Sequence, residues 1–260
     1  MIGASAIGTS HITSNTPCQD HFESKVIVTR KGPVLAVVVC DGAGSASHAD
    51  IGARLAATTL IELIELHYGN EQPATANRDC AVEWLTAVAD ALAAHADVHE
   101  RRLRDYACTV LAAIVGVDEA CFLQVGDGAI VVSHGEEDGW SYVFWPQHGE
   151  FANTTNFVIS RDLETVVEFE HVERRIDEFA VFSDGIENLV LQPKDRCVHS
   201  GFFNSMIQPV RALPEPGFSA ALSDSLATYL SSPVICDRTD DDKTLFLGAR
   251  QGASGTAPVE

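Results

Sequence analysis

Long apolar runs and basic residues are both scarce in this 260-residue chain. No apolar segment approaches the roughly 18 residues that a membrane-spanning helix needs. The N-terminal stretch MIGASAIGTSHITSN has neither the basic start nor the apolar core of a signal peptide. Only 17 Lys and Arg stand against 37 Asp and Glu, which gives a formal net charge of −20. Because this charge repels phosphate backbones, we expect no binding to nucleic acid. The lack of a membrane-spanning run and of a signal peptide makes a cytoplasmic protein without a membrane partner our expectation.

Several familiar site patterns are also missing. The seven cysteines are odd in number, and no two have CxxC spacing, so we expect reduced thiols rather than disulfides or a thiolate metal site. The chain has no GxSxG elbow and no GxxxxGK[ST] loop. His95 and His99 have a spacing that can bind zinc, but Ala96 stands where a metalloprotease has glutamate. A solvated helix face is the simpler interpretation of the two histidines.

Apolar residues make up 46% of the sequence, enough for one substantial core. This amount allows a single large domain or at most two small ones, and of these we predict a single domain over residues 1–248. The low-complexity end, which includes QGASGTAPVE, predicts a disordered tail over 249–260.

The periodicity of apolar residues predicts a mixed order of strands and helices. Strands are expected at 2–9, 22–30, 34–40, 107–116, 120–126, 129–133, 141–145, 165–171, 178–183 and 243–248, and helices within 45–69, 79–104, 185–191 and 217–231. The polar stretch 146–163 is expected to form a surface loop that contacts substrate. Because strands and helices do not alternate regularly, the order favours an α+β fold, with antiparallel sheets and helices packed outside.

The first long helix has candidate end signals. Ser47, with Asp50 three residues later, predicts its start, and Gly69 predicts its end. Its expected buried stripe comprises Leu55, Leu60, Leu63, Ile64 and Leu66.

Acidic residues stand at the margins of apolar strands in five separate places. These residues are Asp20, Asp41, Asp127, Asp184 and the run Asp240–Asp242. Asp-Gly is a common hairpin signal, and Asp127-Gly128 fits that simple interpretation. Asp41-Gly42 and Asp184-Gly185, however, each lead from a strand into helical sequence, where a two-residue hairpin has no role.

These carboxylates would repel one another if the strand ends converge, and repulsion raises carboxyl pKa values unless cations neutralise the charge. A set of oxygen ligands suits Mg²⁺ or Mn²⁺. Gly42 would leave its carbonyl free to approach an ion closely. Two metal ions bridged by one aspartate would acidify a water molecule and hold a phosphoryl oxygen.

The ordered motifs QD, CDGAG, VGDGA, FSDGIE and DDKT resemble those of the metal-dependent Ser/Thr protein phosphatases of the PPM, or type 2C, family. The resemblance extends from about Gly3 to Leu247, and GTSHITSNTPCQD is similar to small stand-alone bacterial members. It implies a four-layer α-β-β-α sandwich, in which two antiparallel sheets are flanked by helices.

The resemblance also implies a metal site. Asp41 would bridge two metal ions, and the carbonyl of Gly42 would bind one of them. Asp184 and Asp241 would complete the second site, with Asp240 as the rival for Asp241. The implied cofactors are two Mn²⁺ or Mg²⁺ ions, and bacterial members add a third.

Other residues in or near the motifs either have a role that the resemblance implies or differ from the usual family pattern. Asp127 corresponds to the ligand of the third metal, and Asp20 to a residue that contacts metal-bound water. Asn15 stands where the family usually has a phosphate-binding arginine, and His11 is the candidate replacement. Ala43 stands where some members have a candidate general-acid histidine.

The implied reaction is hydrolysis of phosphoserine or phosphothreonine by a metal-bridging water, without a phosphoenzyme. The implied partners are phosphorylated proteins, including a cognate Ser/Thr kinase and its substrates. Two alternatives stay open at this point. One is a catalytically weak phosphatase-like domain that binds a phosphoprotein or another partner, and the other is hydrolysis of a small phosphorylated molecule.

Overall fold

The computed structural model of the chain describes residues 1–70, 75–133, 139–147 and 155–251. Residues 252–260 of the expected tail and residues 148–154 of the expected substrate loop lie outside these described residues. Within the described ranges, no helix is long and apolar enough to cross a membrane. All seven cysteines are free thiols, as expected.

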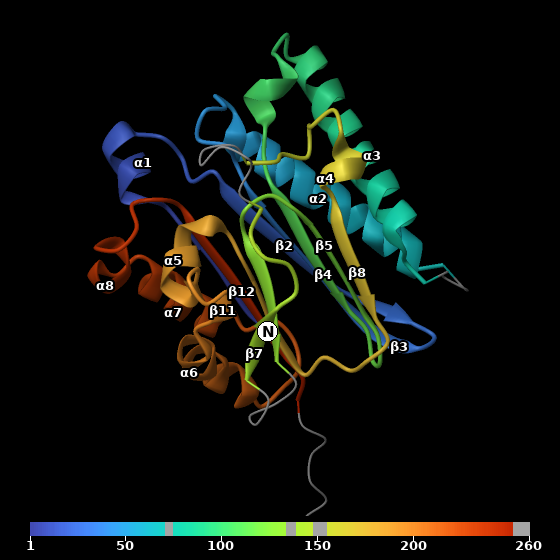
Figure 1. The fold of residues 1–260 in the computed structure, drawn as a ribbon, viewed down its shortest axis with the longest axis vertical. Helices are drawn as coiled ribbons and strands as arrows, with labels where there is room; N and C mark the ends of the chain where they lie inside the picture. The colour runs from blue at the N-terminus through green and yellow to red at the C-terminus, as the bar shows by residue number, and fades with distance from the viewer. Residues whose placement is uncertain (71–74, 134–138, 148–154, 252–260) are drawn as a thin grey trace, which may run out of the picture.

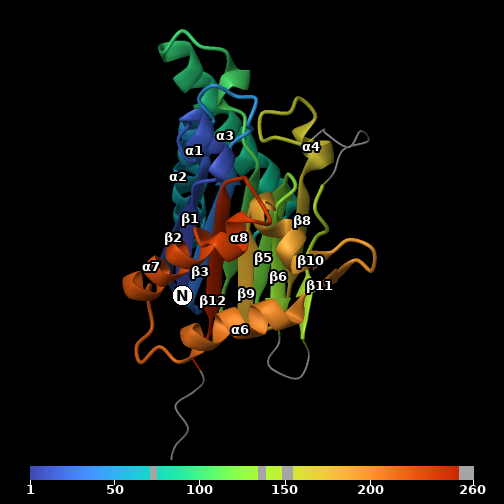
Figure 2. The same cartoon turned by 90° about the vertical axis from the view of Figure 1, so that its left-hand side faces the viewer.

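The described strands form two five-stranded antiparallel sheets, which pack face to face (Figures 1 and 2). The first sheet contains, in spatial order, β1 (Ile2–Ala6), β12 (Lys243–Ala249), β9 (Glu178–Phe182), β6 (Ala129–Ser133) and β7 (Trp140–Tyr142). The second contains β2 (Asp20–Thr29), β3 (Gly32–Asp41), β4 (Val110–Val115), β5 (Ala120–Val125) and β8 (Glu168–Val172). A small hairpin joins β10 (Leu191–Gln192) to β11 (Cys197–Val198).

Helices cover the outer face of each sheet (Figures 1 and 2). The pair α2 (Ala49–Tyr68) and α3 (Arg78–Val98) packs on the second sheet, and the pair α6 (Ser200–Arg211) and α7 (Ala220–Leu230) packs on the first. The shorter helices are α1 (Thr9–Ser14), α4 (Leu163–Val166), α5 (Glu187–Val190), α8 (Pro233–Cys236) and the 3₁₀ turns η1 (Leu103–Tyr106) and η2 (Asp184–Ile186). This arrangement confirms the predicted four-layer sandwich.

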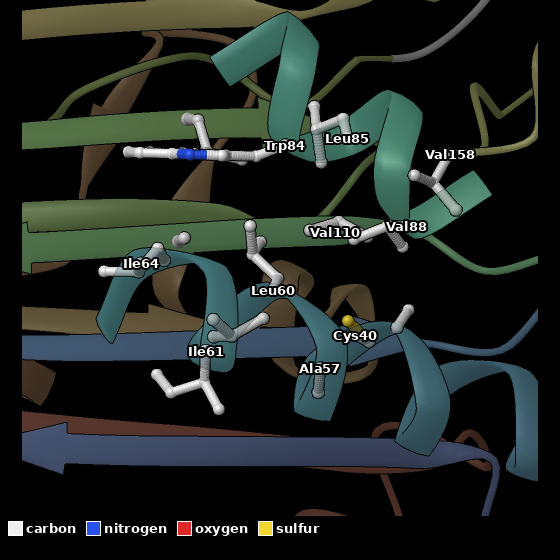
Figure 3. Packing of buried hydrophobic residues seen from close by; sticks show 14 of the residues in the cluster. Cys40, Ala57, Leu60, Ile61, Ile64, Trp84, Leu85, Val88, Val110 and Val158 are labelled. Atoms are coloured by element: carbon white, nitrogen blue, oxygen red, sulfur yellow. The ribbon is translucent and has the colours of Figure 1, made fainter. Parts of the chain in front are cut away.

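Strand β3 shows how the layers are held together. Its alternate residues Val37 and Val39 face the other sheet, whereas Val38 and Cys40 face the helices. All four are fully buried, which explains why the whole strand is apolar. Figure 3 shows Leu60 and other side chains of α2 and α3 packed over this face.

The predicted ends of the two long helices needed correction. Helix α2 is capped by His48 without a side-chain cap bond, so Ser47 and Asp50 do not form the expected cap. Gly69 follows the helix as expected, but Leu66 is 68% exposed and lies outside the buried stripe. Leu66 follows the buried Ile64 by only two residues, so it lies on the side of the helix opposite the buried stripe.

Helix α3 ends at Val98 rather than at residue 104. Glu100 adopts a left-handed φ of 54°, and the Arg101 N–H donates to the Ala96 carbonyl at 2.8 Å. This is a Schellman-type ending, which usually has glycine at the left-handed position. Because glutamate occupies that position here, the sequence had no visible stop signal.

Helix α6 was not predicted from the sequence. Gly201 and Pro209 lie inside it and mask its periodicity. The helix forms because Phe203, Ile207 and Val210 are buried on one face against the first sheet. Tertiary packing therefore overrides the local preference.

Candidate metal centre

A cavity of about 170 Å³ lies where strands of both sheets end. Its walls include four carboxylates, which are Asp41, Asp127, Asp184 and Asp241. These residues come from the end of β3, the β5–β6 turn, the segment after β9 and the segment before β12. The structure thus brings together four segments that are far apart in the sequence.

Asp20 lies directly beside Asp41, because β2 and β3 pair these two residues across the sheet. Asp20 is only 6% exposed and is absent from the cavity wall, so it supports the site from behind. Its Oδ2 accepts a 2.6 Å hydrogen bond from the Ser183 hydroxyl. Its Oδ1 is buried and has no hydrogen-bond partner among the described residues.

Burial and crowding change the acidity of these groups. Burial is the main cause that raises the pKa of Asp20 to about 7 and that of Asp184 to about 6. Burial, and then the nearby charge of Asp20, raises the pKa of Asp41 well above its usual range. Burial likewise raises the pKa of Asp241. Without cations, the site therefore favours protonated carboxyl groups.

The three consecutive aspartates before β12 have three different environments. Asp240 is exposed and does not line the cavity, whereas Asp241 lines it. Asp242 is only 2% exposed and turns away from the cavity. The placement therefore favours Asp241 over Asp240 as a candidate ligand.

Asp242 joins the N-terminal segment to β12. Its Oδ1 accepts a hydrogen bond from the Gly8 N–H at 2.6 Å, and its Oδ2 accepts one from the Gln19 N–H at 2.5 Å. The same Oδ2 lies 2.8 Å from Nδ1 of His11. His11 lines the cavity, so Asp242 fixes the position of a candidate substrate-binding residue. This role of Asp242 was not predicted from the sequence.

Two glycines allow these segments to come close enough. A Cβ on Gly42 would lie 2.7 Å from the Cβ of Ala49, at the start of α2. A Cβ on Gly185 would overlap with the backbone oxygen of Asp242. Gly42 lines the cavity as expected, but its lack of a side chain is required for helix packing, which was not predicted.

The remaining candidates are placed differently. Asp127 lines the cavity, and its Oδ2 accepts a 2.5 Å hydrogen bond from the Thr155 hydroxyl. Asn15 is exposed at the end of α1 and does not reach the cavity wall. Among the described residues, no lysine or arginine lines this cavity. His11 is therefore the basic residue that the described wall offers to a phosphate.

The donor set fits hard divalent cations. Asp20 Oδ1, Asp184 Oδ1 and Gln19 Oε1 are buried oxygens without a hydrogen-bond partner among the described residues. Unsatisfied buried oxygens are costly unless a ligand completes them. In the described part of the chain, no three His, Cys, Asp or Glu side chains form a ready-made metal cage. The oxygens themselves are nevertheless the ligands that Mg²⁺ and Mn²⁺ prefer.

The fold and the cavity together define a class of protein: an α-β-β-α sandwich with an acidic pocket at one end of its sheets. Residues 7–231 match the family described as protein phosphatase 2C. The serine/threonine-protein phosphatase 3 of Escherichia coli (strain K12) is 34% identical over 248 residues, which cover 95% of this chain and 96% of that protein. The chain therefore belongs to the protein phosphatase 2C family and is an enzyme of that class, which confirms the resemblance seen in the motifs.

Solved structures support the same fold. A bacterial serine phosphatase matches with a TM-score of 0.63 and 12% identity, over 96% of this chain and 97% of that one. The serine/threonine phosphatase Stp1 from Staphylococcus aureus matches with a TM-score of 0.62 and 12% identity, over 96% and 94%. The serine/threonine phosphatase of S. agalactiae has a TM-score of 0.63 and 13% identity, over 96% and 98%.

Proposed function

We propose that the chain hydrolyses phosphoserine and phosphothreonine in proteins, using two Mn²⁺ or Mg²⁺ ions held in the acidic cavity. The observation that carries this proposal is the meeting of four carboxylates from distant segments in one cavity of about 170 Å³. So many carboxylates repel one another, and divalent cations are the natural compensation. The proposal treats residues 1–248 as one phosphatase domain acting in the cytoplasm, opposite a Ser/Thr kinase.

The residues proposed to hold the two ions are Asp41, Asp184, Asp241 and the carbonyl of Gly42, with Asp127 available to a third ion. Bound divalent cations would supply an acidified water and would neutralise charge on the phosphoryl oxygens. The chain's own residues then orient these groups. The backbone N–H of Asp41 donates to the Thr109 hydroxyl at 3.1 Å, which fixes the end of β3 at the cavity.

His11 and Asp20 have supporting roles in this proposal. The Asp242 carboxylate accepts from Nδ1 of His11, so the other ring nitrogen, Nε2, can donate to a phosphoryl oxygen of the substrate when the ring carries both protons. The Ser183 hydroxyl holds one oxygen of Asp20, while the other remains without a partner among the described residues. That oxygen is suited to accept a hydrogen bond from a water in the site.

The first test is phosphate release from a phosphothreonine peptide, measured with Mn²⁺ and with EDTA. We expect release only with the metal. Asp241→Asn should lower kcat/KM by roughly 10²-fold or more, because it removes a charged ligand. Asp240→Asn is the matched control, because this neighbouring aspartate is exposed and outside the cavity. Its activity should match that of the wild type.

The binding-module alternative makes a different prediction. It requires that the wild-type chain bind a phosphothreonine peptide in the presence of Mn²⁺ without releasing phosphate. Calorimetry with the same peptide and metal would detect that outcome and would overturn the proposed reaction. The family relationship does not favour this alternative.

A further inference from the structure

Lys243, the first residue of β12, is a lysine with no solvent exposure. Its Nζ donates to the backbone carbonyl of Asp241 at 2.8 Å and to that of Ile7 at 3.4 Å. Among the described residues, no carboxylate oxygen lies within 4.0 Å of this ammonium group. The lysine is therefore buried with neutral hydrogen-bond acceptors as its direct partners.

A buried ammonium group without a paired charge is costly, and a methionine or leucine would fill the same space more cheaply. The surroundings offer a reason why a cation is tolerated. Asp241 and Asp242 precede Lys243 directly, and Asp184 is next to Gly185, where an added Cβ would lie 3.3 Å from Cγ of Lys243. The negative field of these carboxylates offsets the cost of burying the positive charge.

Lys243 also contacts three segments that build the cavity. Its ammonium group holds the carbonyl of Asp241, which lines the cavity wall. It holds the carbonyl of Ile7, just before Gly8 and the helix that carries His11. Its aliphatic stem packs beside Gly185, next to Asp184. A single side chain thus joins the backbones that carry two candidate ligands and the candidate phosphate contact.

We propose that Lys243 is a positioning residue: it fixes the backbone of Asp241 so that the carboxylate of Asp241 faces the cavity, and it thereby sets the affinity of the site for divalent cations. This inference rests on the proposed function, because it assumes that Asp241 is a ligand. It assigns no contact between Lys243 and the substrate.

The test is calorimetric titration of Mn²⁺ into the full chain, without substrate, for the wild type and for Lys243→Met. Removing a positive charge from an acidic site should by itself tighten cation binding, whereas losing the hold on Asp241 should weaken it. We expect Lys243→Met to bind Mn²⁺ at least tenfold more weakly. Lys243→Gln, which keeps an N–H donor without the charge, should recover part of that affinity.

Ser223→Ala is the matched control, because Ser223 is also buried and makes two hydrogen bonds, but it lies on α7 away from the cavity. Its Mn²⁺ affinity should equal that of the wild type even if its melting temperature falls. Unchanged Mn²⁺ affinity in Lys243→Met would show that the lysine only fills space, and tighter binding would show that it acts only through charge. Either result overturns the inference.

Two further outcomes separate this inference from the proposed function. If the wild type binds no Mn²⁺, the proposed function itself fails, whereas a wild type that binds Mn²⁺ and releases phosphate leaves only the role of Lys243 in question. If Lys243→Met does not fold, Lys243→Gln decides alone. Weaker binding than in the wild type then supports the positioning role, and equal or tighter binding rejects it.

Discussion

The two ends of the same sheets differ sharply in chemistry. Strand β3 begins with Pro33 and Leu35 at a cavity of about 460 Å³, and it ends with Asp41 at the acidic cavity of about 170 Å³. The larger cavity has mainly apolar walls, to which Val26, Phe179 and Val210 also contribute. A well-formed apolar cavity is the usual first candidate for a ligand site. In this protein, the smaller and more polar cavity carries the candidate chemistry.

The difference shows what each end contributes to the molecule. At the apolar end, side chains close the space between the sheets and favour folding. At the acidic end, carboxylates are held together against their mutual repulsion, which is a cost that only a ligand can offset. We therefore expect substitutions of the carboxylates at the acidic end to reduce activity more than stability, and substitutions at the apolar end to leave activity nearly unchanged.

The largest expected effect comes from Asp41→Asn. Because Asp41 is the proposed bridging ligand, kcat/KM on a phosphothreonine peptide should fall by about 10³-fold or more. In EDTA, the melting temperature of the variant should equal or exceed that of the wild type, because one repelling charge is removed. A large fall in melting temperature would contradict the contrast between the two ends.

Gly185→Ala should have the next largest effect, on both folding and activity. Its new methyl group would overlap with the backbone oxygen of Asp242 and force η2 away from β12. We expect a loss of roughly 2–4 kcal/mol in the free energy of unfolding, measured by urea denaturation. Gly44→Ala is the control, because nothing lies within 4 Å of its added methyl. Equal stabilities for the two variants would show that the close approach is not required.

The pH dependence of the metal-free protein gives a smaller effect. The pKa of Asp20 is raised to about 7 and that of Asp184 to about 6, both above the usual aspartate value of 3.8. Between pH 7 and pH 4, the folded state therefore binds protons that the unfolded state has released. The free energy of unfolding should therefore rise as the pH falls through this window.

Thermal unfolding in EDTA at about pH 7.5, 6.0 and 5.0 tests whether stability rises as the pH falls. These pH values roughly span the two raised pKa values. The variant Asp20→Asn separates the contribution of the Asp20 carboxyl group from the general relief of charge repulsion on acidification. Its melting temperature should rise less than that of the wild type as the pH falls. With saturating Mn²⁺ the trend should reverse, because cations bind the ionised carboxylates. A steeper rise for Asp20→Asn than for the wild type would contradict the assignment.

The smallest expected effect is at the apolar end. Val26 lines the larger cavity and is 48% exposed, so Val26→Ser should cost less than about 1 kcal/mol in stability. The kcat/KM for the phosphothreonine peptide should change less than about twofold, since no proposed ligand is touched. A tenfold loss of activity would show that the two ends are coupled through the sheets.

Features that depend on near neighbours could be predicted from the sequence. The apolar run before Asp41 predicted a strand over residues 34–40, and its alternate residues are buried in two different layers. The end of α3 could not be predicted, because Glu100 adopts a left-handed conformation that normally signals glycine. Helix α6 could not be predicted either, because Pro209 and Gly201 weaken its local preference and only packing on the first sheet stabilises it.

The sequence by itself determined the succession of the strands that form the two large sheets, the sandwich class and the set of aspartates at strand ends, because apolar periodicity and short motifs are local. The tertiary structure alone decided which aspartate of the run before β12 faces the cavity. That choice depends on Asp242 accepting the N–H of Gly8, a residue 234 positions away. The tertiary structure also decided that Lys243 is buried and that Gly185 lies close to the backbone oxygen of Asp242. Contacts over such distances leave no periodic trace in the sequence, because only the folded chain brings their partners together.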